Sequence, residues 1–326
     1  MSVRGARLVI CLAGTVGLLA SQTDVSASDL FSSEPGSLLR GESISVEPII
    51  GYLRGSSGEY VYNTSNRNQK LSQLDWNINA LAVGGRVAVR PLDWLTLRGR
   101  LWATVSSGGD MTDYDWLAGY FGKDSWTHRS VHPDTELAKA WQGDVSLAMS
   151  YYADEDLALT VLAGYRHYDV KYNSRGGSFV YSSFAFRDTV GSFPDGQLGI
   201  TYRQTWQTPY LGLGANYNGE NWTVGVEVIG SPFVMARTRD NHVLRNTVFT
   251  DDFDMSGMVG VSAGVEYRFS PILSVTGRVE YQKYFETKGG TTIQDNSTGT
   301  VVRVPKPGAG ADSDSLLLSV GVKTRI

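Results

Sequence analysis

Two short clusters of aspartate and histidine have the residue types and spacing needed to activate a water molecule. Asp113 and Asp115 lie two positions apart, as do Asp240 and His242. On an extended strand, residues i and i+2 point to the same side, so each pair presents its polar groups together. Asp240 beside His242 would orient the imidazole and let it act as a general base. Asp113 and Asp115 would titrate jointly, with one pKa raised, and could hold the water or protonate a leaving amine.

Other roles for these residues remain open on the sequence alone. Aspartates in loops commonly form turns or stay solvated. Asp110, Asp113 and Asp115 could together bind Ca²⁺, which prefers closely spaced oxygen ligands. His128 and His132 resemble a zinc pair in spacing, but a proline follows directly and no helix is evident, so we expect no metal and no other cofactor. The Ser/His/Asp signature of a hydrolase nucleophile elbow does not occur.

The N-terminal residues predict export from the cytoplasm. Two arginines precede an apolar stretch over residues 8–20, and a small-residue cleavage site follows at 25–27. We therefore expect a signal peptide at residues 1–27 and a single mature domain at 28–326; a buried N-terminal helix is the alternative. The one cysteine, Cys11, lies in the signal, so the mature chain should lack disulfides and thiolate sites.

The mature segment predicts β-strands with one apolar and one polar face. Residues 259–269, 273–282 and 318–326 alternate strictly, with Val, Leu, Ile and aromatic residues at every second position. Aromatic residues such as Tyr267 and Tyr281 stand at strand ends, as in the aromatic girdles of membrane barrels. Acidic and basic residues number 33 and 29, for a net charge of −4, which excludes a basic nucleic-acid surface.

Connection lengths distinguish a transmembrane barrel from a soluble sandwich. Short turns alternate with long polar segments, the asymmetry of outer-membrane barrels with tight periplasmic turns and longer outer loops. We predict an all-β antiparallel barrel of about ten strands with both termini periplasmic, in which both polar pairs reach one extracellular cleft from opposite sides. The predicted short turns lie at 90–93, 153–156, 218–221 and 270–271, and the long segments at 57–68, 109–136, 174–197, 236–255 and 285–312.

Several longer motifs resemble the omptin family of outer-membrane proteases. They are Lys70–Trp76, Gly108–Trp116, Ser130–Thr135, Arg175–Ser178, Phe186–Asp188 and Gly191–Pro194, and the resemblance extends over most of the mature chain. It implies a ten-stranded barrel at the bacterial outer membrane with an active site facing outward. It also implies peptide hydrolysis by water held between an Asp–His couple and an Asp–Asp couple, without a covalent intermediate. These couples match Asp240 with His242 and Asp113 with Asp115.

The resemblance is weaker in the substrate-binding residues. The family selects basic residues with an acidic pocket, and Glu59 matches one of its two carboxylates. The second acid normally lies two positions before the catalytic aspartate, where this chain has Thr238. Met111 and Ile200 complete the predicted substrate-binding set. We therefore expect a peptidase that cleaves near basic residues, with preference for Arg or Lys weakened or redirected. Ser130 and His132 match rim residues of the family, for which a structural role is the alternative.

Lipid binding is a second point of difference. The family binds lipopolysaccharide through outward arginines and needs it for activity, but Asp169 and Thr205 occupy those positions here. Any lipopolysaccharide activation would have to use other basic groups. The expected partners are peptide or protein substrates and outer-membrane lipid, and the expected state is a monomer. The chain ends in Ile326 where such barrels usually end in an aromatic residue.

Two other functions fit the same fold. A binding or adhesion barrel would use the long loops to engage host proteins and would survive loss of Asp113 or His242. A passive pore is less consistent with the sequence, because a barrel of about ten strands is filled by its own side chains.

Overall fold

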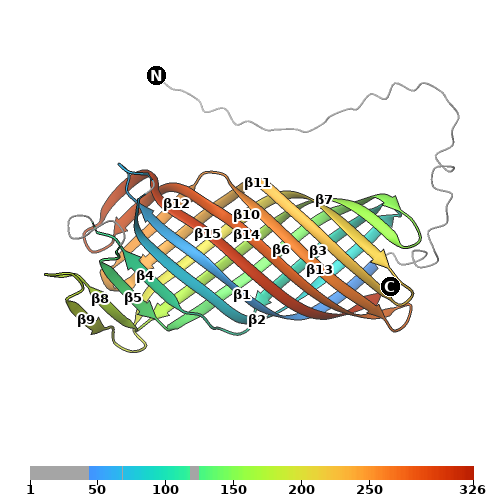
Figure 1. The fold of residues 1–326 in the computed structure, drawn as a ribbon, viewed down its shortest axis with the longest axis horizontal. Helices are drawn as coiled ribbons and strands as arrows, with labels where there is room; N and C mark the ends of the chain where they lie inside the picture. The colour runs from blue at the N-terminus through green and yellow to red at the C-terminus, as the bar shows by residue number, and fades with distance from the viewer. Residues whose placement is uncertain (1–43, 68, 118–124) are drawn as a thin grey trace, which may run out of the picture. The chain divides into compact units, whose positions relative to one another are not determined.

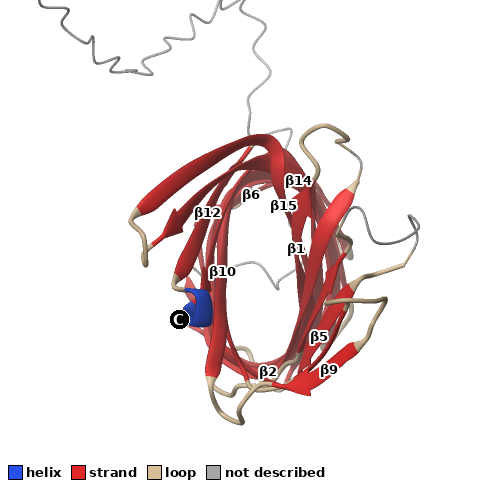
Figure 2. Ribbon diagram, turned by 90° about the vertical axis from the view of Figure 1, so that its left-hand side faces the viewer, coloured by secondary structure: helices blue, strands red, loops and turns tan. Residues whose placement is uncertain are grey.

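The structure, a computed structural model, describes residues 44–67, 69–117 and 125–326. The predicted signal peptide at 1–27 and the first residues of the predicted mature domain lie outside the described residues. Within the described chain, one antiparallel sheet closes on itself through the pairing of its first and last strands. Figure 1 shows the barrel from the side, and Figure 2 shows it from the end that carries β5, β9 and β12.

Ten strands of the described chain form the ring of the barrel, and each pairs antiparallel with its neighbours, so the predicted fold is confirmed. In order they are β1 (Ile44–Tyr62), β2 (Lys70–Leu92), β3 (Leu95–Thr104), β6 (Asp134–Ala153), β7 (Leu157–Arg175), β10 (Leu198–Asn218), β11 (Trp222–His242), β13 (Ser256–Arg268), β14 (Leu273–Asp295) and β15 (Thr300–Arg325).

Five shorter strands lie at the end of the barrel opposite the short turns (Figure 1). They are β4 (Met111–Asp115), β5 (His128–His132), β8 (Ser178–Tyr181), β9 (Thr189–Ser192) and β12 (Thr247–Phe253). β4 and β12 continue the ladders of β3 and β13 along β2 and β14. We call the part of the wall formed by these five short strands the outer extension. In the described chain the one helical element is a 3₁₀ turn, η1 (Val243–Arg245), and no helix there is long and apolar enough to cross a membrane.

The four short turns lie where the sequence predicted them, but strand continues far into three of the predicted polar loops. The connections after β1, β11 and β14 shrink to residues 63–69, the 3₁₀ turn at 243–246 and residues 296–299. The prediction was wrong there because it relied on apolar alternation, which lipid imposes. Beyond the membrane both faces of a strand meet water, so the ladder continues without that signal.

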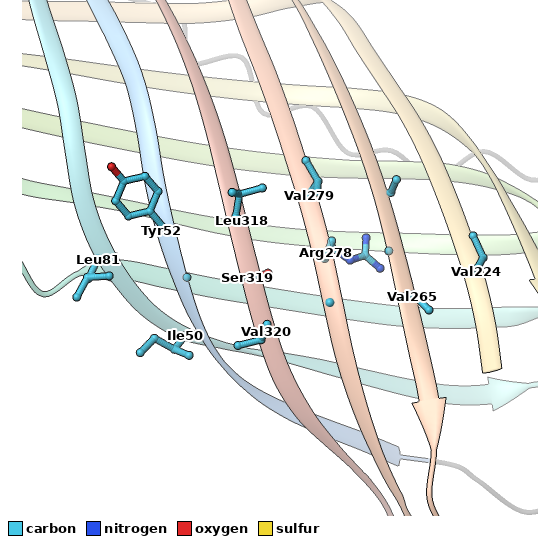
Figure 3. Close-up of a pocket in the computed structure, with 14 residues that line it drawn as sticks. Ile50, Tyr52, Leu81, Val224, Val265, Arg278, Val279, Leu318, Ser319 and Val320 are labelled. Carbon is cyan, nitrogen blue, oxygen red and sulfur yellow. The ribbon is translucent and has the colours of Figure 1, made fainter. Parts of the chain in front are cut away.

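The outward face of the barrel wall next to the short turns is apolar. On β11, Val224, Val226 and Val228 are 40–50% exposed, while Glu227 between them points inward and pairs with Arg98. Figure 3 shows the same outer surface on neighbouring strands, where small residues leave a shallow apolar hollow among valine, leucine and isoleucine side chains. This hollow lies on the lipid-facing wall, far from the acidic clusters. The alternation therefore produces a surface suited to lipid.

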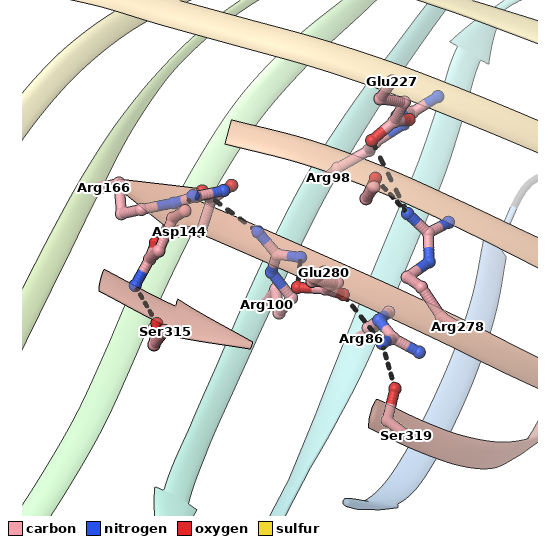
Figure 4. A network of polar contacts seen from close by, with 12 residues as sticks. Arg86, Arg98, Arg100, Asp144, Arg166, Glu227, Arg278, Glu280, Ser315 and Ser319 are labelled. Carbon is pink, nitrogen blue, oxygen red and sulfur yellow. Dashed lines mark hydrogen bonds and ion pairs between the residues drawn. The ribbon is translucent and has the colours of Figure 1, made fainter. Parts of the chain in front are cut away.

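The inward face of the same wall is charged. Arg86 bridges Glu47 at 2.6 Å and Glu280 at 3.0 Å. Glu280 also pairs with Arg100 (Figure 4). Asp144 extends the network, pairing with Arg100 at 3.4 Å. Charges buried together in this way satisfy one another, which a protein interior requires.

A layer of buried aromatic rings lies between this network and the outer extension. Trp206 and Tyr284 stack at 4.7 Å between ring centroids. Nearer the outer end, Trp76 stacks between Tyr172 and Tyr202 at 5.2 and 5.3 Å, and all three rings are fully buried. These rigid, stacked side chains fill the interior of the barrel below the acidic clusters.

Candidate active site

Asp240 and His242 form a hydrogen-bonded couple at the outer end of β11. Both side chains point inward, and His242 Nε2 lies 2.6 Å from Asp240 Oδ2. Arg245, in the 3₁₀ turn that follows, donates from Nη2 to His242 Nδ1 at 2.6 Å. Nδ1 therefore accepts a hydrogen bond, and Nε2 carries the hydrogen that Asp240 binds. The other carboxylate oxygen of Asp240 is buried and has no hydrogen-bond partner among the described residues.

Asp113 and Asp115 lie on β4 and share one face of it. Ser72, on β2, donates a hydrogen bond to Asp113 Oδ1 at 3.4 Å. Burial raises the pKa of Asp113 well above its ordinary value, and the charge of Asp115 raises it further. Burial also raises the pKa of Asp115, although Ser72 and nearby positive charges oppose this effect. The two carboxyls therefore titrate as a pair, and burial favours states in which the pair holds a proton.

The two couples face each other across the mouth of the barrel. β4 and β11 are separated in the sheet by β2, β1, β15, β14 and β12, so only inward side chains can meet. The Asp240 charge raises the pKa of Asp113, and Arg245 lowers the pKa values of both Asp113 and Asp115. The two predicted pairs thus act on each other's surroundings from opposite parts of the ring.

The predicted substrate-binding residues lie on the strands that carry or neighbour the two couples. Met111 is fully buried and lies on β4 two positions before Asp113, and Ile200 of β10 pairs directly with His242. Glu59, on β1, is 7% exposed and accepts a hydrogen bond from Trp76 Nε1 at 3.3 Å. Burial raises the pKa of Glu59 well above its usual range, and the charges of Asp240 and Asp251 add to this effect.

Thr238 is not alone on its side of the pocket. Its hydroxyl donates to Asp251 Oδ2 at 2.5 Å, and Asp251 lies directly opposite it on β12. The sequence analysis did not single out Asp251, because it lies in a polar segment predicted to be a loop. One signal in the sequence could have identified Asp251. Few residues separate His242 from the next polar segment, and this spacing favours a tight turn followed by a returning strand.

The sequence of this chain matches a known protein family over most of its length. The omptin family profile matches residues 40–326. This chain belongs to the omptin family. It is 32% identical to outer membrane protease OmpP of Escherichia coli K12, over 97% of this chain and 98% of that protein. It is 29% identical to the plasminogen activator of Yersinia pestis, over 96% and 98% of the two chains.

The omptin fold is also that of a solved structure. The crystal structure of outer membrane protease OmpT from Escherichia coli aligns with a TM-score of 0.83 and 28% identity, covering 87% of this chain and 97% of that chain. The predicted barrel, outer-membrane location and peptidase class are confirmed with the family.

The rim residues Ser130 and His132 of this omptin form a buried structural contact. His132 Nε2 lies 2.9 Å from Ser130 Oγ, and His132 Nδ1 lies 2.6 Å from the carbonyl oxygen of Gly176. Burial lowers the pKa of His132, which favours the neutral ring. Both ring nitrogens are thus engaged, and the imidazole joins β5 to the turn before β8.

The metal sites considered from the sequence do not assemble. The Asp110 carboxylate accepts a hydrogen bond from the exposed side chain of Asn77 at 2.8 Å. His128 contacts Thr127 at 3.0 Å, whereas His132 bonds to Ser130 and Gly176. Across residues 44–67, 69–117 and 125–326, no group of three or more His, Cys, Asp or Glu is arranged to hold a metal ion.

Proposed function

We propose that this omptin hydrolyses peptide bonds near basic residues with a water molecule held between Asp113 with Asp115 and Asp240 with His242. The observation that carries the proposal is the opposition of the two couples across one buried mouth, close enough for the Asp240 charge to act on Asp113. A water between them would touch a base on one side and a shared carboxyl proton on the other.

His242 is the proposed general base. Its Nδ1 accepts a hydrogen bond from Arg245, so this nitrogen carries no hydrogen and has a lone pair for a proton. When substrate and water displace Arg245, the water oxygen attacks the peptide carbonyl carbon and its proton passes to Nδ1. Asp240, bound to Nε2 at 2.6 Å, stabilises the imidazolium that forms.

The aspartate pair is the proposed acid. The raised pKa of Asp113 favours a proton on the pair. As the C–N bond breaks, that proton can pass to the leaving amine, and the pair recovers it through solvent or the imidazolium.

The test is cleavage of an Arg-Arg peptide by the refolded protein with lipopolysaccharide, beside Asp240→Ala. We expect cleavage by the natural chain and a loss of about 10²- to 10⁴-fold in the variant, because the base His242 then lacks the carboxylate that orients it and stabilises its imidazolium. Equal activity of the two proteins would reject the assigned mechanism.

Lipopolysaccharide is the lipid that we propose binds the outer extension. Asp169 and Thr205 do not supply arginines; Asp169 is 1% exposed and binds Arg203 at 2.5 Å. Instead, a row of four exposed cations crosses the outward wall, each directly paired with the next: Lys139, Lys171, Arg203 and Arg239. Like charges placed directly opposite destabilise a sheet, and bound phosphate groups would neutralise them.

This lipid proposal has its own test. We expect Lys171→Gln to raise the lipopolysaccharide concentration needed for half-maximal cleavage, with little change in cleavage at saturating lipid. Identical lipid titrations of both proteins would contradict it. We further infer a monomer, because one chain closes the ring and supplies both couples; analytical ultracentrifugation in detergent measures this.

A further inference from the structure

The pocket of this omptin contains a buried carboxylate that the family pattern does not predict. Thr238 occupies the position where an acid was expected, and Asp251 lies across the β11–β12 ladder from it. The Asp251 residue is 4% exposed, and its Oδ2 accepts the Thr238 hydroxyl at 2.5 Å. The carboxylate therefore points to the same inward side as Thr238.

One oxygen of Asp251 is without a partner. Asp251 Oδ1 is buried and makes no hydrogen bond among the described residues, and neither does the hydroxyl of Thr291, which faces it from β14. A buried carboxylate oxygen without a donor costs free energy, and such a site is satisfied when a ligand supplies the donor.

Asp251 and Glu59 act on the same space. The charge of Asp251 raises the pKa of Glu59, and burial raises the pKa of Tyr202, with the charges of both carboxylates adding to that effect. Their strands are joined through β15 and β14, where Ala311 pairs with Glu59 and Thr291 pairs with Asp251.

We propose that Asp251 replaces the missing pocket acid and, with Glu59, binds the basic side chain of the substrate residue that precedes the cleaved bond. The assignment rests on the proposed peptide hydrolysis in this cleft. A guanidinium or ammonium group would donate to Asp251 Oδ1 and to Glu59 and would neutralise two carboxylates held in a low-dielectric site. Arg and Lys preference is accordingly retained, with its acid moved from β11 to β12.

The pKa of Asp251 is consistent with this role. Burial raises it to about 6, and the charges of Asp240 and Asp252 add to the effect, while the hydrogen bond from Thr238 opposes it. An arriving cation offsets the cost of ionising such a carboxyl, so it binds more tightly than a neutral side chain of equal shape.

The experiment compares two peptides that differ only at the residue before the cleaved bond, arginine or its neutral isostere citrulline. For Asp251→Asn we expect the arginine-to-citrulline ratio of kcat/KM to fall about 10- to 100-fold, the value of one charge-assisted hydrogen bond. Cleavage of the citrulline peptide should change little. Asp252→Asn is the matched control, because Asp252 is the next residue but points outward, with a side chain 71% exposed and paired to Arg237.

A swap variant tests the position of the acid. Thr238→Asp with Asp251→Thr moves the carboxylate back to β11, and we expect it to restore the ratio that Asp251→Asn loses. An unchanged ratio in Asp251→Asn, or an equal loss for both peptides, would overturn the assignment and leave Asp251 a structural residue.

A binding measurement separates this assignment from the proposed function. Fluorescence anisotropy with the same labelled peptides reports pocket recognition without turnover. Arginine-selective binding that depends on Asp251, without cleavage, would support the pocket and reject the proposed hydrolysis. Cleavage with no Asp251-dependent selectivity would do the reverse, and absence of both would overturn both.

Discussion

His242 lies between two residues of opposite charge, and these contacts determine which of its ring nitrogens carries the hydrogen. Asp240 binds Nε2 and Arg245 binds Nδ1, so the nitrogen that must take a proton is covered by a cation in the free protein. Arg245 also lowers the pKa values of Asp113 and Asp115. A single arginine therefore acts on both halves of the proposed site.

Replacing Arg245 tests this arrangement. In Arg245→Ala the pKa values of Asp113 and Asp115 rise, because the positive charge that lowers them is gone. If cleavage needs one ionised carboxylate in the pair, the acid limb of the kcat/KM profile moves to higher pH. Arg245→Lys should keep the limb near its natural position. Superimposable profiles of all three proteins would contradict the prediction.

The ionised form of Asp113 should lower the stability of the folded protein, although the residue is needed for catalysis. Its pKa is raised in the folded protein, so its folded state is most favoured at low pH and loses stability as pH rises through the folded pKa. Asp113→Asn should therefore raise the melting temperature at pH 8 more than at pH 5, while cleavage falls by about 10²-fold or more. Melting curves at both pH values check this, and a lower melting temperature at pH 8 would refute it.

At the level of strands, the sequence predicted the membrane part well and the outer extension poorly. Lipid demands apolar residues at alternate positions, so segments such as 259–269 were recognisable as strands. The outer ends of β1, β11 and β14 lie in water and carry no such pattern. The catalytic candidates were found from their motifs, but Asp251 depends on the register of β12 against β11, which follows from the tight 3₁₀ turn.

The β8–β9 hairpin supports the cleft through a tight glycine turn. Gly177 has φ +104°, and a Cβ there would lie 2.3 Å from the Val131 carbonyl oxygen and 2.9 Å from His132 Nδ1. Gly177→Ala should destabilise the hairpin by about 1–3 kcal/mol and reduce cleavage, with the membrane part intact. Hydrogen exchange of the outer strands measures this.

Gly196 provides the control for that substitution. It also has positive φ, at +70°, but nothing lies within 4 Å of a Cβ there. Gly196→Ala carries the backbone cost without the collision, so it should affect the cleft less. Equal effects of the two variants would assign the role of Gly177 to backbone freedom alone.

For the whole molecule, the charged network in the lumen joins strands that lie far apart in the ring. Glu280 of β14 contacts Arg86 of β2 and Arg100 of β3, and its side chain is 11% exposed. Glu280→Gln leaves two partly buried arginines short of a partner, and removing one member of a buried ion pair costs about 3 kcal/mol. Urea unfolding in lipid vesicles should show that loss, whereas cleavage at low temperature should change little. Unchanged stability would show that the remaining acids compensate.

The position of the cleft inside the mouth has a consequence for target selection. Asp240 is 2% exposed and Glu59 is 7% exposed, so their carboxylates lie inside the wall of the outer extension. A folded domain presents a convex surface, so we expect a target segment to open locally before it reaches these carboxylates. When opening is faster than cleavage, the rate tracks the free energy of that opening in the target. A ligand that stabilises a folded target should then protect it in proportion to its binding energy, so this protease would act as a sensor of the target's local unfolding.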